Sequence, residues 1–152
     1  MGLFRVLVAA YGLAAVPIVF LGLSLPDADW GDGERFHFFN SGLLLAIAAV
    51  FVASLTIRSR TRRLSPVFVG FFCAGLLLSI LQALGSLGYL LGTLILFAPF
   101  LALIVVPPIV VHVFIVRDAW RCSTVTEDRL EFSRFVFGLV VPLVLLWLCL
   151  SA

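Results

Sequence analysis

The sequence is poor in charge and contains no lysine. Only 12% of its 152 residues are charged, 63% are hydrophobic, and the ten basic residues are all arginine. Water-soluble domains are about a quarter charged and about half apolar, so a soluble domain of this length could not hide so much apolar surface. The composition therefore predicts that lipid is the solvent. The net charge of +2 is too small to indicate a nucleic-acid partner.

Patterns typical of catalysis and metal binding are also missing. The cysteines, Cys73, Cys122 and Cys149, form no CxxC pair and indicate neither a disulfide framework nor a zinc site. His37 is predicted at the outer edge of the second span and His112 near the inner edge of the fourth, so the two lie too far apart to share one haem iron. The loops hold no clustered His/Asp or Ser/His set. We therefore expect no enzyme, no cofactor and no bound metal.

Long apolar segments dominate what is present. A membrane-spanning helix needs about 20 apolar residues, and five segments reach or approach that length. They are residues 3–24, 40–57, 66–84, 90–116 and 135–151. The stretch from Pro66 to Val116 has no formal charge and is too long for one crossing, so it must fold back; the turn chemistry of residues 85–89 predicts the reversal there. The prediction is a single all-α domain over residues 1–152, a polytopic transmembrane bundle of five spans, or four if the last crosses in part.

Arginine is distributed on one side of this arrangement. Every arginine except Arg35 falls on the side of the N-terminus, and positively charged loops face the cytoplasm. We therefore expect a cytoplasmic N-terminus and an integral protein of a bacterial inner membrane. The segment of residues 26–35, which is rich in acidic side chains, is expected to form a solvated loop on the opposite side.

Local signals predict where two of the helices begin. Ser65 followed by Pro66 is typical of an N-cap and a first-turn proline. Residues 124–127 fit a capping box, which predicts a helix that starts near position 126 and leads into the last span. On that helix, Glu131 and Arg134 are spaced to form an ion pair.

Small residues follow two of the predicted helices at a spacing of three or four. Helices in lipid approach closely where side chains are small or share hydrogen bonds. Both stripes are therefore predicted seams, either within the chain or between copies. Their residues are Gly42, Ala46, Ala49 and Ala53 in the first stripe, and Gly75, Ser79, Gln82 and Ala83 in the second.

Two prolines predict an irregularity in the fourth span. Pro107 and Pro108 remove backbone donors, so they are expected to bend or unwind the helix and to free carbonyls near Leu103 and Ile104. His112 is expected to bond to one of those carbonyls, which makes these residues a candidate polar site.

The remaining candidate is a surface for a cytoplasmic partner. The segment between the fourth and fifth spans balances its charges and carries an aromatic residue. Its candidate contacts are Trp120, Arg121, Glu127 and Arg129. Three functions stay open: a non-catalytic subunit or scaffold that binds lipid and another membrane protein, a homo-oligomeric pore or membrane-disrupting effector lined by Ser79, Gln82, Ser86 and Thr93, and a membrane enzyme or uncoupled carrier. The subunit is favoured because, apart from His112, no ionisable side chain with a charge near neutral pH lies deep in a span.

Overall fold

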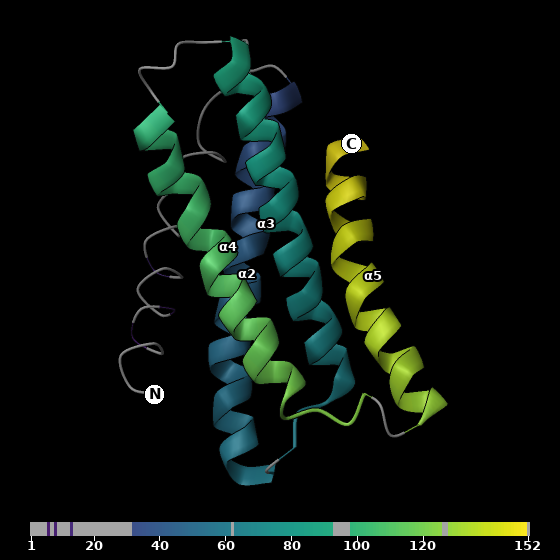
Figure 1. Cartoon of the computed structure of the whole chain (residues 1–152). Helices are drawn as coiled ribbons and strands as arrows, with labels where there is room; N and C mark the ends of the chain where they lie inside the picture. Colours follow the sequence, from purple (N-terminus) through teal and green to yellow (C-terminus); the bar gives the residue numbers. More distant parts are fainter. Residues whose placement is uncertain are drawn as a thin grey trace.

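The computed structural model describes residues 32–61, 63–92, 98–125 and 128–151, together with Val6, Val8 and Leu13. Within these ranges the chain is all-α, as predicted, and forms four helices (Figure 1). They are α2 (Asp32–Thr61), α3 (Pro66–Gly92), α4 (Ala98–Trp120) and α5 (Arg129–Ser151). The first predicted span, residues 3–24, lies outside the described residues apart from the three named positions, so five spans stay a prediction.

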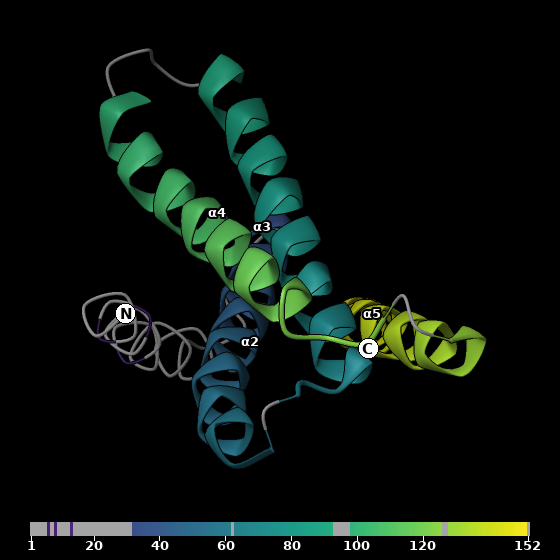
Figure 2. The same cartoon turned by 60° about the horizontal axis from the view of Figure 1, so that its bottom comes forward.

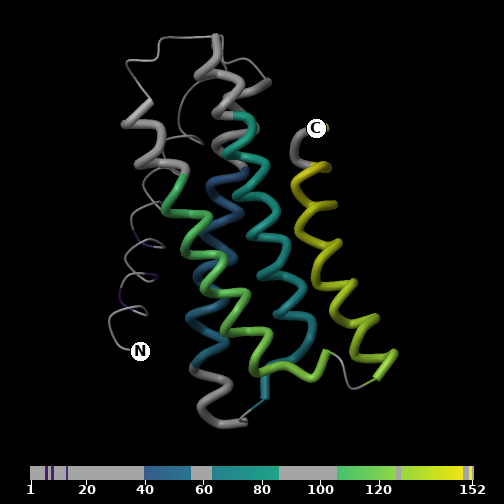
Figure 3. Tube along the Cα trace, in the orientation of Figure 1, coloured from purple at the N-terminus to yellow at the C-terminus, as the bar shows by residue number. Residues whose placement is uncertain are grey.

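Helix α3 is the centre of the bundle. It contacts α2, α4 and α5, and α5 lies beside it on the side away from α4 (Figures 1 and 2). The α2–α3 and α4–α5 connections lie at the same end of the bundle (Figure 3). That arrangement confirms that the long uncharged stretch folds back, since α3 and α4 run side by side in opposite directions.

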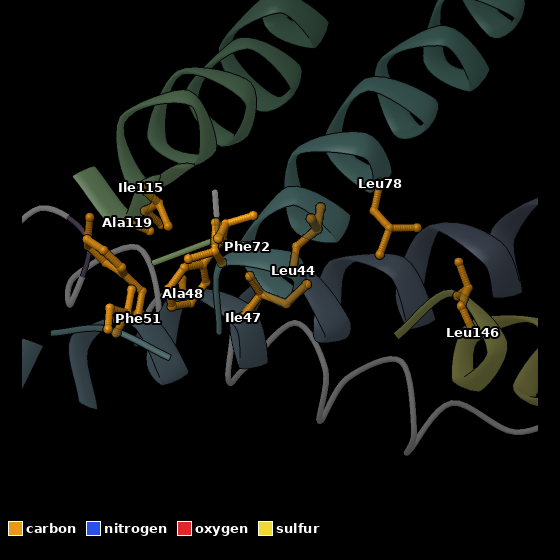
Figure 4. Close-up of a cluster of buried hydrophobic side chains, with 13 residues drawn as sticks. Leu44, Ile47, Ala48, Phe51, Phe72, Leu78, Ile115, Ala119 and Leu146 are labelled. Carbon is orange, nitrogen blue, oxygen red and sulfur yellow. The ribbon is translucent and has the colours of Figure 1, made fainter. Parts of the chain in front are cut away.

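The core forms where α2, α3 and α4 face one another. On α2 the buried residues Leu44, Ile47, Ala48 and Phe51 are spaced three or four apart, which places them on one face of the helix (Figure 4). The ring of Phe51 meets that of Phe72 from α3 edge to face, with centroids 5.2 Å apart. Aromatic pairs favour this geometry. Ile115 and Ala119 of α4, Leu146 of α5 and Val8 complete the cluster with other buried residues.

Two predicted boundaries are wrong in position. The reversal expected at residues 85–89 does not occur there, because α3 continues through Gly85 and Gly88 to Gly92. A helix in an apolar environment satisfies its own backbone hydrogen bonds, so glycine does not end it. Helix α2 begins at Asp32, about two turns before Asn40, where the predicted span and the apolar segment of this helix both start. Part of the acidic segment is therefore helical and not a loop.

The starts of α3 and α5 follow local chemistry. Helix α3 begins at Pro66, as predicted, and the amide of Phe68 donates to the carbonyl of Ser65 at 3.0 Å. Helix α5 begins at Arg129, whose amide donates to the Asp128 carboxylate at 2.6 Å.

The capping box predicted at residues 124–127 is therefore misplaced. The Thr124 hydroxyl donates instead to Glu131 at 3.1 Å, and positions 126 and 127 lie outside the described residues. The predicted pair of Glu131 and Arg134 is confirmed at 2.6 Å.

Two of the described helices are long and apolar enough to cross a membrane. These segments are Pro66–Gly85 of α3 and Arg129–Leu148 of α5, and a shorter apolar segment spans Asn40–Leu55 of α2. Helix α5 buries little of its apolar surface: Phe137 and Trp147 are 65% and 67% exposed. Large contiguous apolar surfaces are rare on soluble monomers. This surface favours membrane insertion of α5.

Candidate functional site

Polar side chains gather between α2, α3 and α4. The fully buried polar residues among those described are Asn40, Ser54, Ser79 and His112. All but Ser54, which bonds to its own helix at the Phe51 carbonyl, join two helices. We call Asn40, Ser41, Ser79, Gln82 and His112 the polar seam, because hydrogen bonds connect its members across the helix interfaces.

His112 is held by α3 as well as by its own helix. Its Nδ1 lies 2.8 Å from the Pro108 carbonyl oxygen and 3.2 Å from Ser79 Oγ. A carbonyl only accepts, so this nitrogen carries the proton and donates to Pro108. Ser79 Oγ donates to the Gly75 carbonyl at 2.9 Å, which leaves its lone pairs facing the imidazole. The ring is thus fixed as a hydrogen-bond donor through Nδ1.

Gly75 makes room for this imidazole. A Cβ atom at position 75 would stand 2.7 Å from His112 Cδ2 and 2.7 Å from Ile47 Cγ2, both far closer than ordinary van der Waals contact. The absent side chain therefore lets α2 and α4 approach α3 at one level. Gly75, Ser79 and Ala83, three members of the stripe predicted on α3, are all buried.

Asn40 forms the second part of the polar seam. Its Nδ2 donates to the Leu78 carbonyl at 3.2 Å and to Gln82 Oε1 at 3.3 Å, while Gln82 Nε2 donates to Ser41 Oγ at 3.1 Å. Asn40 Oδ1 has no hydrogen-bond partner among the described residues. These bonds fix the register between α2 and α3.

Sequence reasoning missed Asn40 because it placed this residue at the end of a span. The longer α2 brings the side chain into the interior. A signal was available: Asn40 precedes the buried Leu44 by four residues and Ile47 by seven, the spacing of one helix face.

The stripe predicted on α2 faces outward. Ala46, Ala49 and Ala53 are exposed and Gly42 is half-buried, whereas the large residues of the same helix point into the core. The structure thus places the α2 stripe away from the contacts of the described helices, and the α3 stripe among them.

The sequence did not predict the close backbone contact between α3 and α5 at Gly70 and Gly138. A Cβ atom on Gly70 would overlap the Phe135 carbonyl oxygen, and one on Gly138 would overlap the Val67 carbonyl oxygen. The two glycines therefore allow the backbones to touch. They lie on different helices, so spacing along the sequence contains no sign of their pairing.

The proline pair leaves α4 helical. The helix continues through Pro107 and Pro108, so the predicted unwinding does not occur. A carbonyl partner for His112 was expected, but the predicted carbonyl was wrong. The ring bonds to the carbonyl of Pro108 itself, one turn away, and not to that of Leu103 or Ile104. A side chain one turn along reaches this carbonyl without any break in the helix.

The predicted partner surface is only partly described. Trp120, Arg121 and Arg129 are exposed, while Glu127 lies outside the described residues. The Trp120 ring packs edge-on against Phe135 of α5, with centroids 5.9 Å apart. This aromatic contact joins the end of α4 to the first turns of α5.

Chemically, the polar seam is suited to holding helices together. Its side chains bond to one another and to backbone carbonyls, which fixes helix positions. Among the described residues, no group of three His, Cys, Asp or Glu side chains could hold a metal ion. The chain matches no protein-family model, no curated protein sequence and no solved structure.

Proposed function

We propose that this chain is a non-catalytic subunit or scaffold of a membrane complex in a bacterial inner membrane. In this proposal it crosses the bilayer five times, or four if the last helix crosses in part, with a cytoplasmic N-terminus. The observation that carries the proposal is the outward orientation of Ala46, Ala49 and Ala53 on α2. The partner is another membrane protein whose helix covers that face.

The outward faces of α5 and α2 differ in the size of their side chains. Helix α5 presents Phe137, Trp147 and other large side chains, which fill space among acyl chains and at the interface. Helix α2 presents only small ones along its stripe. Because small residues let helix backbones approach closely, a second helix makes more favourable van der Waals contacts with this stripe than lipid does.

The homo-oligomeric pore has less support. Its proposed lining residues Ser79 and Gln82 bond within the chain, to Gly75, Asn40 and Ser41, so a pore between copies would have to break these bonds. Ser86 and Thr93 have no described side chains. An enzyme or uncoupled carrier also has less support, because the side chains of the polar seam serve helix contacts.

The test is native mass spectrometry after the full chain is purified from its own cells in mild detergent. We expect a second membrane protein at fixed stoichiometry, lost in Ala49→Leu and retained in Val144→Leu, a control on the exposed face of α5. A wild-type chain that is monomeric, or that binds only copies of itself, would refute the proposal.

A second measurement identifies which helix covers the stripe. A cysteine at Ala49 in the intact complex is cross-linked and the product is mapped. Attachment to the second protein supports the proposal, whereas attachment only to residues 3–24 of the same chain assigns the stripe to an internal contact and refutes it.

A further inference from the structure

A cavity of about 310 Å³ opens at the end of the bundle that holds both described connections. Its volume is at the lower end of the range of about 300–1,000 Å³ seen for small-molecule sites. The lining residues come from the α2–α3 connection, the α4–α5 connection and the first turns of α3 and α5. They are Arg63, Leu64, Ser65, Pro66, Thr124, Asp128, Glu131 and Arg134.

Backbone contacts build the walls of this cavity. The Leu64 amide donates to the Cys122 carbonyl at 3.0 Å, and Leu64 pairs with Ser123 in a short parallel bridge. Thr124 is tied to α5 through its bond to Glu131. The two connections are therefore joined to each other and to α5.

The walls carry charges of both signs. Glu131 already receives hydrogen bonds from Arg134 and Thr124. Among the contacts of the described residues, the Arg134 guanidinium uses one of its N–H groups for that pair, although guanidinium has five. Asp128 accepts from the Arg129 amide through one oxygen. Guanidinium and carboxylate side chains thus line the same small space.

The position of the cavity along the helices places it at the level of lipid headgroups in the proposed membrane arrangement. The two segments that could cross a membrane begin at Pro66 and Arg129, and the cavity is lined by residues at these two starting points. Where a spanning helix begins, hydrocarbon gives way to the polar headgroup layer. The arginine distribution places this end on the cytoplasmic side.

We propose that this cavity binds a phosphoethanolamine group, a phosphate ester that carries a primary ammonium. Arg63 and Arg134 bind the phosphate, as guanidinium groups do, and Asp128 accepts a hydrogen bond from the ammonium. Phosphocholine offers no N–H to Asp128, and phosphoglycerol offers no cation, so both bind less well. The proposal rests on the membrane placement given under the proposed function, but not on the partner protein.

The experiment uses the full chain in micelles that contain equal amounts of phosphatidylethanolamine, phosphatidylcholine and phosphatidylglycerol with identical acyl chains. Retained lipid is counted by native mass spectrometry. Wild type is expected to retain phosphatidylethanolamine about tenfold over each of the others, the effect of one charge-assisted hydrogen bond.

Two pairs of variants separate the roles of the charges. Asp128→Asn keeps an N-cap residue for α5 but loses the preference over phosphatidylcholine, while the control Asp118→Asn, on α4 and outside the cavity lining, keeps it. Arg63→Gln lowers retention of phosphatidylethanolamine and of phosphatidylcholine, and its control Arg117→Gln does not. Equal retention of the lipids by wild type, or identical behaviour of Asp128→Asn and Asp118→Asn, would overturn the proposal.

Two further measurements show whether the ligand is a lipid or the free headgroup, and which of the two proposals a negative result contradicts. Displacement of the lipid by soluble phosphoethanolamine supports recognition of the group alone, and selective retention without displacement supports recognition of the intact lipid. Flotation of the chain with vesicles of the same lipids tests the membrane placement separately. A chain that floats without selectivity overturns this inference alone, whereas one that does not float overturns the proposed function as well.

Discussion

Replacing Gly138 with alanine is expected to weaken the docking of α5 on α3. The new Cβ would overlap the Val67 carbonyl oxygen and stand 2.8 Å from its carbonyl carbon, whereas ordinary contact begins at 3.4 Å. The obstacle is backbone, which cannot rotate away, so the helices must separate by roughly half an ångström or more.

The magnitude follows from two opposing terms. Overpacking a close contact costs about 1–3 kcal/mol, and a backbone obstacle places Gly138→Ala in the upper part of that range. Alanine recovers about 1 kcal/mol over glycine through helix propensity. The expected net loss in the free energy of unfolding is therefore about 1–2 kcal/mol. The control is Gly85→Ala, at an exposed position of α3, where only the favourable propensity term applies.

A double variant tests the geometry more strictly. Gly70→Ala would meet the Phe135 carbonyl across the same contact, so one separation of the helices relieves both overlaps. The double variant is therefore expected to lose clearly less stability than the two single losses added together. The assay is unfolding by sodium dodecyl sulfate in mild detergent, followed by tryptophan fluorescence. Equal stability of Gly138→Ala and Gly85→Ala, or fully additive losses, would refute the reasoning.

Two further predictions concern the polar seam and Gly75, which lies against His112 of that seam. Gly75→Ala is expected to cost less than Gly138→Ala, because its obstacles are the side chains of His112 and Ile47, which can shift; a larger loss in the same titration would contradict this. Asn40→Leu and Gln82→Leu are expected to show a coupling energy of about 0.6 kcal/mol in a double-mutant cycle, typical of hydrogen bonds between membrane helices. Strict additivity would show that their 3.3 Å contact contributes nothing.

Helix α3 shows how far local sequence signals reach. Pro66 marks its first residue correctly because proline fixes a backbone angle suited to the first turn. The turn predicted at Gly85 and Gly88 was wrong, since the same residues form turns in water and continue helices in apolar surroundings. Whether water or apolar groups surround these glycines decides between the two outcomes. Those surroundings depend on the whole molecule and not on the local sequence.

The candidate sites divide in the same way. The Glu131–Arg134 pair lies within one turn of one helix, so spacing alone predicted it. The cavity at Arg63 and Asp128 brings together two connections that are far apart in the chain. No local pattern indicates that distant segments meet, because their meeting depends on how α3 packs against its three neighbours.

The sequence by itself determined the apolar character of the chain, the helical form of its described segments and the end at which arginine gathers. These properties depend on composition and on spacing within single helices. The tertiary structure decided that the alanine stripe of α2 faces outward, that Gly70 and Gly138 let the backbones of α3 and α5 touch, and that Asn40 and His112 share a buried seam. Each of these depends on the rotation of one helix relative to another, which is set by packing between helices.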